Sequence, residues 1–124
     1  MRLRWLEAPL SVCRLSSADA VPVWATRPGS LFCTVRTPGE LSVVCESALV
    51  PDGVRREGPF RAFEVQGPLP FSLVGVLSSL LAPITKAGIS VFVISTFDTD
   101  YVLVPAEAQD QTTLALVAAG HEVG

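Results

Sequence analysis

Apolar residues recur at helical spacing between residues 73 and 84, and this pattern predicts a helix of about four turns. Ser72 lies just before it, where an N-cap hydroxyl would satisfy free backbone donors. Lys86 suits the negative end of the helix dipole, and Gly88 is a typical helix terminator. Pro83 predicts a distortion near the end of the helix. The apolar stripe comprises Leu73, Val76, Leu77, Leu80, Leu81 and Ile84.

Strand patterns flank this helix. Residues 61–66 alternate between apolar and polar side chains and predict a strand. Residues 89–95 form a β-branched and aromatic run, which indicates a strand that is apolar on both faces. Residues 96–100 are typical of a turn, so residues 101–104 should return as the hairpin partner.

A second helix follows the hairpin. Pro105 can open it, with Glu107 and Asp110 in its first turns, and Gly120 can end it. Residues 121–124 leave room for only a short final strand. The order is strand, helix, strand, strand, helix, strand, which predicts an α+β fold of the ferredoxin-like βαββαβ class.

The first half of the chain repeats part of this pattern. Residues 30–44 align without a gap with residues 90–104, at an offset of sixty. Matching positions include Ser30 with Ser90, Phe32 with Phe92, Val44 with Val104, and the acids Glu40 and Asp100. The alignment predicts two tandem repeats.

The N-terminal repeat is expected to be degenerate. Residues 11–15 predict a strand, residues 17–25 a poor helix, and residues 51–53 a loop in place of a second helix. We therefore expect repeats at 1–58 and 59–124. The pattern leaves open whether terminal strands are exchanged between the repeats.

Composition and charge disfavour some classes of binding partner. The chain is 49% hydrophobic and 17% charged, enough to bury a core, and its net charge is −3. Binding to nucleic acid or to an anionic membrane needs a basic patch, which this charge balance disfavours. The apolar stretch 73–84 is too short and too interrupted to span a bilayer. Without a leader-like apolar segment near residue 1, a cytoplasmic location is expected.

Cysteine and histidine usage gives no sign of catalysis. Three cysteines, Cys13, Cys33 and Cys45, lie in apolar runs without a CxxC pair and predict buried thiols. A zinc site or a nucleophile pair would each need the single histidine, His121, and both are weaker alternatives. We therefore expect no cofactor, no metal and no enzymatic activity.

One segment resembles a known family. The residues Gly-Pro-Leu-Pro-Phe at 67–71, the helix after them and the run at 88–105 are similar to tandem ACT-domain proteins. The similarity is to the subgroup related to the cytosolic arginine sensor of animal cells and its bacterial stand-alone relatives. It is strongest over 60–107 and extends to Trp24 and to the strand at 40–45. It implies a regulatory, amino-acid-binding homodimer, and it leaves room for a regulated partner enzyme.

The resemblance also implies a ligand site between two domains. It lies at the helix start and on the neighbouring strand and turn: Phe71, Ser72, Leu73, Val74, Gly75, Ser90, Val91, Thr96, Phe97 and Asp100. The chemistry agrees, because a helix N-terminus suits a carboxylate and Asp100 suits an ammonium or guanidinium. Gly75 would permit close approach, and Phe97 would wall the pocket.

One position departs from the family pattern. An arginine-binding member carries an acid at the helix start, whereas this chain has Leu73 there, so a neutral or apolar amino acid is the expected ligand. Each residue also has an ordinary structural interpretation: Ser72 as a cap, residues 98–100 as turn chemistry, and Gly67 and Gly75 as packing residues. The alternative function is therefore a dimerisation or docking module that binds no ligand.

Overall fold

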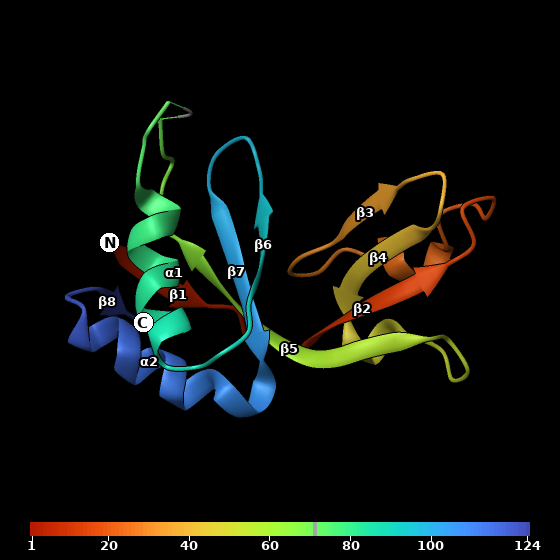
Figure 1. Ribbon diagram of the computed structural model, residues 1–124. Coiled ribbons are helices and arrows are strands. Elements are labelled where there is room, and N and C mark those ends of the chain that lie inside the picture. The colour runs from red at the N-terminus through yellow and green to blue at the C-terminus, as the bar shows by residue number, and fades with distance from the viewer. Residues whose placement is uncertain (71) are drawn as a thin grey trace. The chain divides into compact units, whose positions relative to one another are not determined.

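The computed structural model describes residues 1–70 and 72–124. The chain forms two compact units (Figure 1), one of Met1–Leu6 with Arg61–Gly124 and one of Glu7–Phe60. Strand β5 (Arg56–Val65) supplies residues to both. Strand β1 (Arg2–Trp5) belongs to the C-terminal unit, although it precedes the N-terminal unit in sequence. The repeats expected at 1–58 and 59–124 stay a prediction.

The C-terminal unit has the predicted mixed α+β architecture, with β1 as an added strand. Its sheet runs β6-β7-β5-β1-β8, in which β1 is antiparallel to β5 and parallel to β8. After β5 the elements are α1 (Val76–Lys86), β6 (Phe92–Ser95), β7 (Asp100–Pro105), the 3-10 helix η3 (Ala106–Ala108), α2 (Gln109–Ala118) and β8 (Glu122–Val123).

Both helices of this unit share one core with the sheet. Strands contribute Phe63, Val65 and Val102, while the helices contribute Leu80 and Leu116, and all five are fully buried. Alternate residues of β5 and β7 thus face the helices, as the period of two in a strand requires. The apolar stripe predicted for the helix packs here from Val76 to Ile84, whereas Leu73 lies before α1 and is exposed.

The start of α1 differs from the sequence prediction. The helix begins at Val76 behind Gly75, whose φ of 86° is left-handed, so Ser72 as the N-cap is wrong. The cause lies in the preceding residues, where the Leu73 N–H closes a turn on the Pro70 carbonyl at 3.0 Å. Val74 is consequently outside the helix and 90% exposed.

Pro83 lies inside α1 and has a partner elsewhere in the unit. Proline has no N–H, so the Ser79 carbonyl lacks its usual donor four residues on. The His121 Nε2 atom lies 3.0 Å from that carbonyl oxygen and supplies the missing hydrogen bond. As predicted, Lys86 lies in the last turn, and Gly88, with φ of 78°, follows the helix.

The strand predicted at 89–95 is shorter in the structure, because β6 begins at Phe92. Pro105 ends β7 and leads into η3, and α2 begins at Gln109. The hairpin of β6 and β7 is confirmed, with Ser95 paired with Asp100 at its turn.

The N-terminal unit is a sheet in the order β3-β4-β2-β5, with short 3-10 helices. Its core holds Cys13, Leu41, Val43 and Cys45, with Trp24 packed against them. Its elements are β2 (Leu10–Leu15), η1 (Val23–Thr26), β3 (Cys33–Arg36), β4 (Leu41–Glu46) and η2 (Ser47–Leu49).

The poor helix expected over 17–25 reduces to η1. Side chains of the preceding segment bond to nearby backbone and favour turns: Asp19 Oδ2 accepts the Ser16 N–H at 3.1 Å, and Ser16 Oγ accepts the Ala18 N–H at 3.3 Å. Pro22 then forms the cap of η1.

The hairpins of the two units have matching turns. In each, a threonine N–H bonds the carbonyl three residues on, Thr37 to Glu40 at 2.9 Å and Thr96 to Thr99 at 2.8 Å. In each, the threonine Oγ1 also accepts the N–H of that third residue at 3.2 Å. The structural offset is therefore 59 positions, and the offset of sixty is wrong by one residue. At offset 59, Asp100 corresponds to Leu41 instead of Glu40.

The cysteines lie in strands, as expected, and are free thiols. Cys13 and Cys45 are buried, whereas Cys33 is partly exposed, so the expectation of three buried thiols holds for two. Within the described part of the chain, every helix falls short of the length and apolarity needed to span a bilayer.

Candidate functional site

A pocket of about 600 Å³ opens in the C-terminal unit, between the segment that leads into α1 and the β6–β7 turn. Segments far apart in sequence meet there, one on each side. Its lining residues are Leu69, Pro70, Leu73, Gly75, Val76, Leu77, Ser78, Ser95, Thr96, Phe97, Asp98, Thr99 and Asp100.

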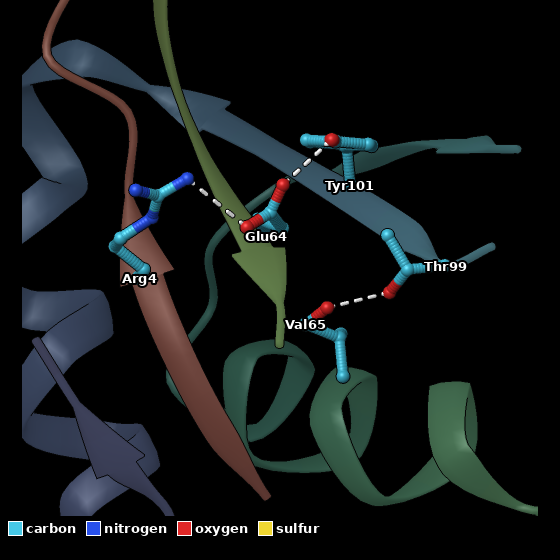
Figure 2. Close-up of polar contacts among 5 residues, drawn as sticks. All are labelled: Arg4, Glu64, Val65, Thr99 and Tyr101. Carbon is cyan, nitrogen blue, oxygen red and sulfur yellow. Dashed lines mark hydrogen bonds and ion pairs between the residues drawn. The ribbon is translucent and has the colours of Figure 1, made fainter. Parts of the chain in front are cut away.

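Hydrogen bonds fix the two sides of this pocket together. The Leu69 N–H donates to the Asp98 carbonyl at 2.8 Å, which joins the segment after β5 to the turn. Thr99 Oγ1 donates to the Val65 carbonyl at 2.5 Å, as Figure 2 shows. The turn is thus tied at two points, to the end of β5 and to the segment that follows it, and these bonds fix the two sides of the pocket relative to each other.

A polar chain across three strands supports the same turn. Tyr101 donates its hydroxyl to Glu64 Oε2 at 2.7 Å, and Arg4 forms an ion pair with Glu64 Oε1 at 3.1 Å (Figure 2). The bond to Glu64, with a smaller contribution from burial, raises the pKa of Tyr101 to about 12. This bracing of β7 against β5 and β1 positions Asp100, the residue before Tyr101.

One wall of the pocket is acidic. Asp98 and Asp100 contribute carboxylates, and Ser95 Oγ donates to Asp100 Oδ1 at 2.6 Å, which orients that carboxylate. The lining holds no lysine, arginine or histidine among the described residues. The wall therefore favours a ligand that carries an ammonium or another cationic group.

The opposite wall is apolar and ends at the start of α1. Leu69, Leu73 and Leu77 supply aliphatic surface. Among the described residues, the first turn of α1 has neither a side-chain cap nor an acidic residue, and the N–H groups of a helix start suit an anion. A Cβ built on Gly75 would meet no described atom within 4 Å, which leaves the approach to the helix start open.

The structure places the predicted site residues in two groups. Leu73, Gly75, Thr96, Phe97 and Asp100 line the pocket together. Ser72, Val74, Ser90 and Val91 do not line it, and Phe71 lies outside the described residues.

The physical reason differs among the excluded residues. Ser90 and Val91 precede β6, and Val91 packs against the core of the unit. Ser72 and Val74 are exposed on the segment before α1.

Sequence reasoning missed several lining residues. Asp98 lies within the turn predicted at 96–100, whereas Ser95 ends the strand predicted at 89–95, and only the hairpin register shows Ser95 opposite Asp100. Leu69 and Pro70 became part of the wall through the bond from Leu69 to Asp98. Val76, Leu77, Ser78 and Thr99 complete the missed set. A sequence prediction that began the helix directly after Gly75 would have included Val76 and Leu77 among the site residues.

The N-terminal unit lacks the chemistry of this pocket. At the structural offset of 59, Arg36 stands where the pocket has Ser95, and buried Leu41 stands where it has Asp100. The Arg36 guanidinium donates from Nη1 to the Ser17 carbonyl. The residue paired with Arg36 is therefore an apolar leucine, whereas the residue paired with Ser95 is an acid.

A metal centre finds no support in the described residues, since no three His, Cys, Asp or Glu side chains there gather closely enough to hold an ion. Burial raises the pKa of the Cys13 and Cys33 thiols and raises that of Cys45 to about 11. Such thiols are poor nucleophiles at neutral pH.

Comparison with known proteins agrees with this architecture. A family model of the ACT domain matches residues 55–117, which is half of the chain, and a model of an N-terminal domain matches residues 10–53. No curated protein sequence matches the chain.

Solved structures share the fold over nearly the whole chain. A protein of Agobacterium tumefaciens is 36% identical over 99% of this chain and 91% of its own, with a TM-score of 0.91. A Vibrio cholerae protein of unknown function, described as a possible transport protein, is 20% identical over 95% of this chain and 88% of its own, with a TM-score of 0.77. The regulatory subunit of aspartate kinase from Thermus flavus is 9% identical over 94% of this chain and 95% of its own, with a TM-score of 0.62. The last two show likeness of fold alone. The family model, which matches half of the chain, shows that this protein belongs to the ACT domain family.

Proposed function

We propose that this protein is a non-catalytic regulatory module of the cytoplasm that binds a small amino acid in the pocket of its C-terminal unit. It would act as a homodimer with the ligand at an ACT–ACT interface, and its regulated partner would be an enzyme. The matching hairpin turns support a tandem ACT architecture, similar to the bacterial relatives of the arginine sensor.

The observation that carries the proposal is the pairing of opposite walls in one pocket. Asp100, oriented by Ser95, suits the ammonium of an amino acid. The uncapped start of α1 suits the carboxylate, and the aliphatic wall with Leu73 suits an apolar side chain. A zwitterion with an apolar side chain satisfies all three.

A thermal-shift screen against the twenty amino acids tests this proposal. At a concentration a hundredfold above its dissociation constant, a ligand stabilises the folded state by about 2.7 kcal/mol, which corresponds to a shift of several degrees. Asp100→Ala should abolish the shift, whereas Asp52→Ala, an exposed acid of the N-terminal unit, should retain it. Leu73→Glu should move the preference towards basic amino acids. If no amino acid produces a shift, the proposal fails.

A docking module without a ligand is the second candidate. It is favoured by the exposed apolar residues Leu114 and Val117 on the outer face of α2, which are 72% and 53% exposed. A flat screen together with loss of association in Leu114→Ser would favour this function.

A further inference from the structure

A small groove of about 170 Å³ lies in the N-terminal unit, on the sheet formed by β4, β2 and the start of β5 (Figure 1). Arg14 of β2 pairs with Ser42 of β4 on one side. On the other side, the Arg14 N–H donates to the carbonyl of Arg55, the residue before β5, at 3.0 Å. Three neighbouring segments thus place Ser42, Arg14 and Arg55 in one row along the groove.

Two like charges lie directly opposite each other in this row. The register that pairs Cys13 with Arg56 continues to Arg14 and Arg55. Cys13 faces the core of the unit, and side chains alternate along a strand, so Arg14 and Arg55 both point to the other face of the sheet. Like charges opposite each other on neighbouring strands destabilise a sheet. An anion bound between the two arginines would remove this repulsion.

The two guanidinium groups keep donors available for such an anion. Arg14 donates from Nη2 to the Gly39 carbonyl at 3.0 Å, which anchors its side chain, and its other side-chain donors meet no described acceptor. Arg55 is exposed and forms neither an ion pair nor a side-chain hydrogen bond with any described residue.

Two acids also line the groove without neutralising these arginines. Neither Glu40 nor Glu57 forms an ion pair with a described residue. Ser42 Oγ donates to Glu40 Oε1 at 2.6 Å, which orients that carboxylate next to the row of Arg14. An oriented carboxylate accepts a hydroxyl hydrogen bond. The groove therefore combines a site for an anion with an acceptor for a hydroxyl group.

The other arginines of the described chain are already bonded or stand alone. Arg27 lines a different pocket, in which it is the single cation and Glu46 supplies an acid. Arg56 lines the same groove but faces the Cys13 side of the sheet, where it donates to the Pro51 carbonyl at 2.9 Å. Ion pairs or bonds to backbone carbonyls engage the rest: Arg2, Arg4, Arg36 and Arg61.

We propose that this groove binds a small phosphomonoester that carries a hydroxyl group, with the phosphate between Arg14 and Arg55 and the hydroxyl on Glu40. Two guanidinium groups match a phosphate monoester, which carries about two negative charges at neutral pH, better than they match the single charge of a carboxylate. The site goes beyond the proposed function, because it lies in the other unit from the amino-acid pocket and takes a ligand of a different class.

Calorimetric titration at fixed ionic strength tests the site, with glycerol 3-phosphate, inorganic phosphate, acetate and glycerol as probes. Glycerol 3-phosphate should bind more tightly than inorganic phosphate, and acetate and glycerol should give no binding heat. Arg14→Gln and Arg55→Gln should each weaken glycerol 3-phosphate binding by roughly tenfold, because each removes charge-assisted hydrogen bonds. Arg27→Gln, which neutralises an exposed arginine outside the groove, should leave the affinity unchanged. Glu40→Gln should narrow the preference for glycerol 3-phosphate over inorganic phosphate.

Thermal unfolding without any ligand provides a second measurement. In phosphate-free buffer at low salt, Arg55→Gln should raise the melting temperature, because it removes the repulsion from Arg14, whereas Arg27→Gln should not. Absence of binding by both phosphates, equal affinities for the two, or equal weakening by Arg27→Gln would overturn the inference. Phosphate binding with a flat amino-acid screen would retain this site and reject the proposed function, and an amino-acid hit without phosphate binding would reject this site alone.

Discussion

The contact between His121 and α1 allows a quantitative test of the local packing. Pro83 leaves the Ser79 carbonyl without its helical donor, and His121 Nε2 supplies one at 3.0 Å. A net hydrogen bond of this kind contributes about 1 kcal/mol. His121→Ala should therefore lower the free energy of unfolding by about that amount while Pro83 is present.

Pro83→Ala changes the outcome, because the alanine introduced there has its own N–H to donate to the Ser79 carbonyl. In that background, His121→Ala should cost close to nothing through this bond, which gives a coupling of about 1 kcal/mol. His121 Nδ1 also lies 3.1 Å from the N-terminal nitrogen of Met1. Loss of that contact is common to both backgrounds and cancels in the cycle.

Urea unfolding of the four proteins of the cycle measures the coupling directly. A parallel cycle that combines Pro83→Ala with Thr113→Val serves as a control, since Thr113 accepts the Trp5 indole N–H at 2.9 Å elsewhere in the unit. The control should be additive. A His121–Pro83 coupling below about 0.3 kcal/mol would refute the reasoning, because it would lie within the scatter of independent sites.

Three further predictions concern titration, reactivity and the N-terminal unit. The pKa of Tyr101 is raised from 10.0 to about 12 by its bond to Glu64, so folding holds this proton more tightly than the unfolded chain does. The stabilisation is present below pH 10 and lost as pH rises to about 12, and the stability difference from Tyr101→Phe, measured by urea titration, should vanish over that window. Iodoacetamide followed by mass spectrometry should modify partly exposed Cys33 before buried Cys45, and the reverse order would contradict the burial. Arg36→Ser should leave unchanged the thermal shift that a bound amino acid produces, because the N-terminal hairpin has Leu41 in place of the acid of the pocket. A second binding event in calorimetry would contradict a single site in the C-terminal unit.

The sequence predicted the C-terminal unit well, because its elements carry strong local signals. The apolar stripe, Gly88 and the turn at 96–100 each specify one conformation. The N-terminal helix was less predictable, since Asp19 and Ser16 direct the chain into turns by bonds that propensity alone does not rank.

The register of the repeat could be established only from the structure. Identities alone favoured an offset of sixty, but backbone bonds at Thr37 and Thr96 set it to 59. That single step changes the counterpart of Asp100 from an acid to buried Leu41.

Half of the predicted site residues line the pocket because the sequence identified the two segments that form it. The helix start was misplaced, because Ser72 is a good cap and the left-handed conformation of Gly75 is not visible in a pattern of apolar residues. Contacts between distant segments, such as Leu69 with Asp98, have no local signal at all.

Amide chemical-shift mapping tests the central claim most directly. Isotope-labelled protein would be titrated with each of the twenty amino acids, and backbone amides would be followed by NMR. Binding in the pocket predicts selective shifts for one or a few amino acids, concentrated at Val76, Leu77, Ser95, Phe97 and Asp100. The absence of shifts with all twenty, or shifts centred elsewhere in the chain, would contradict it.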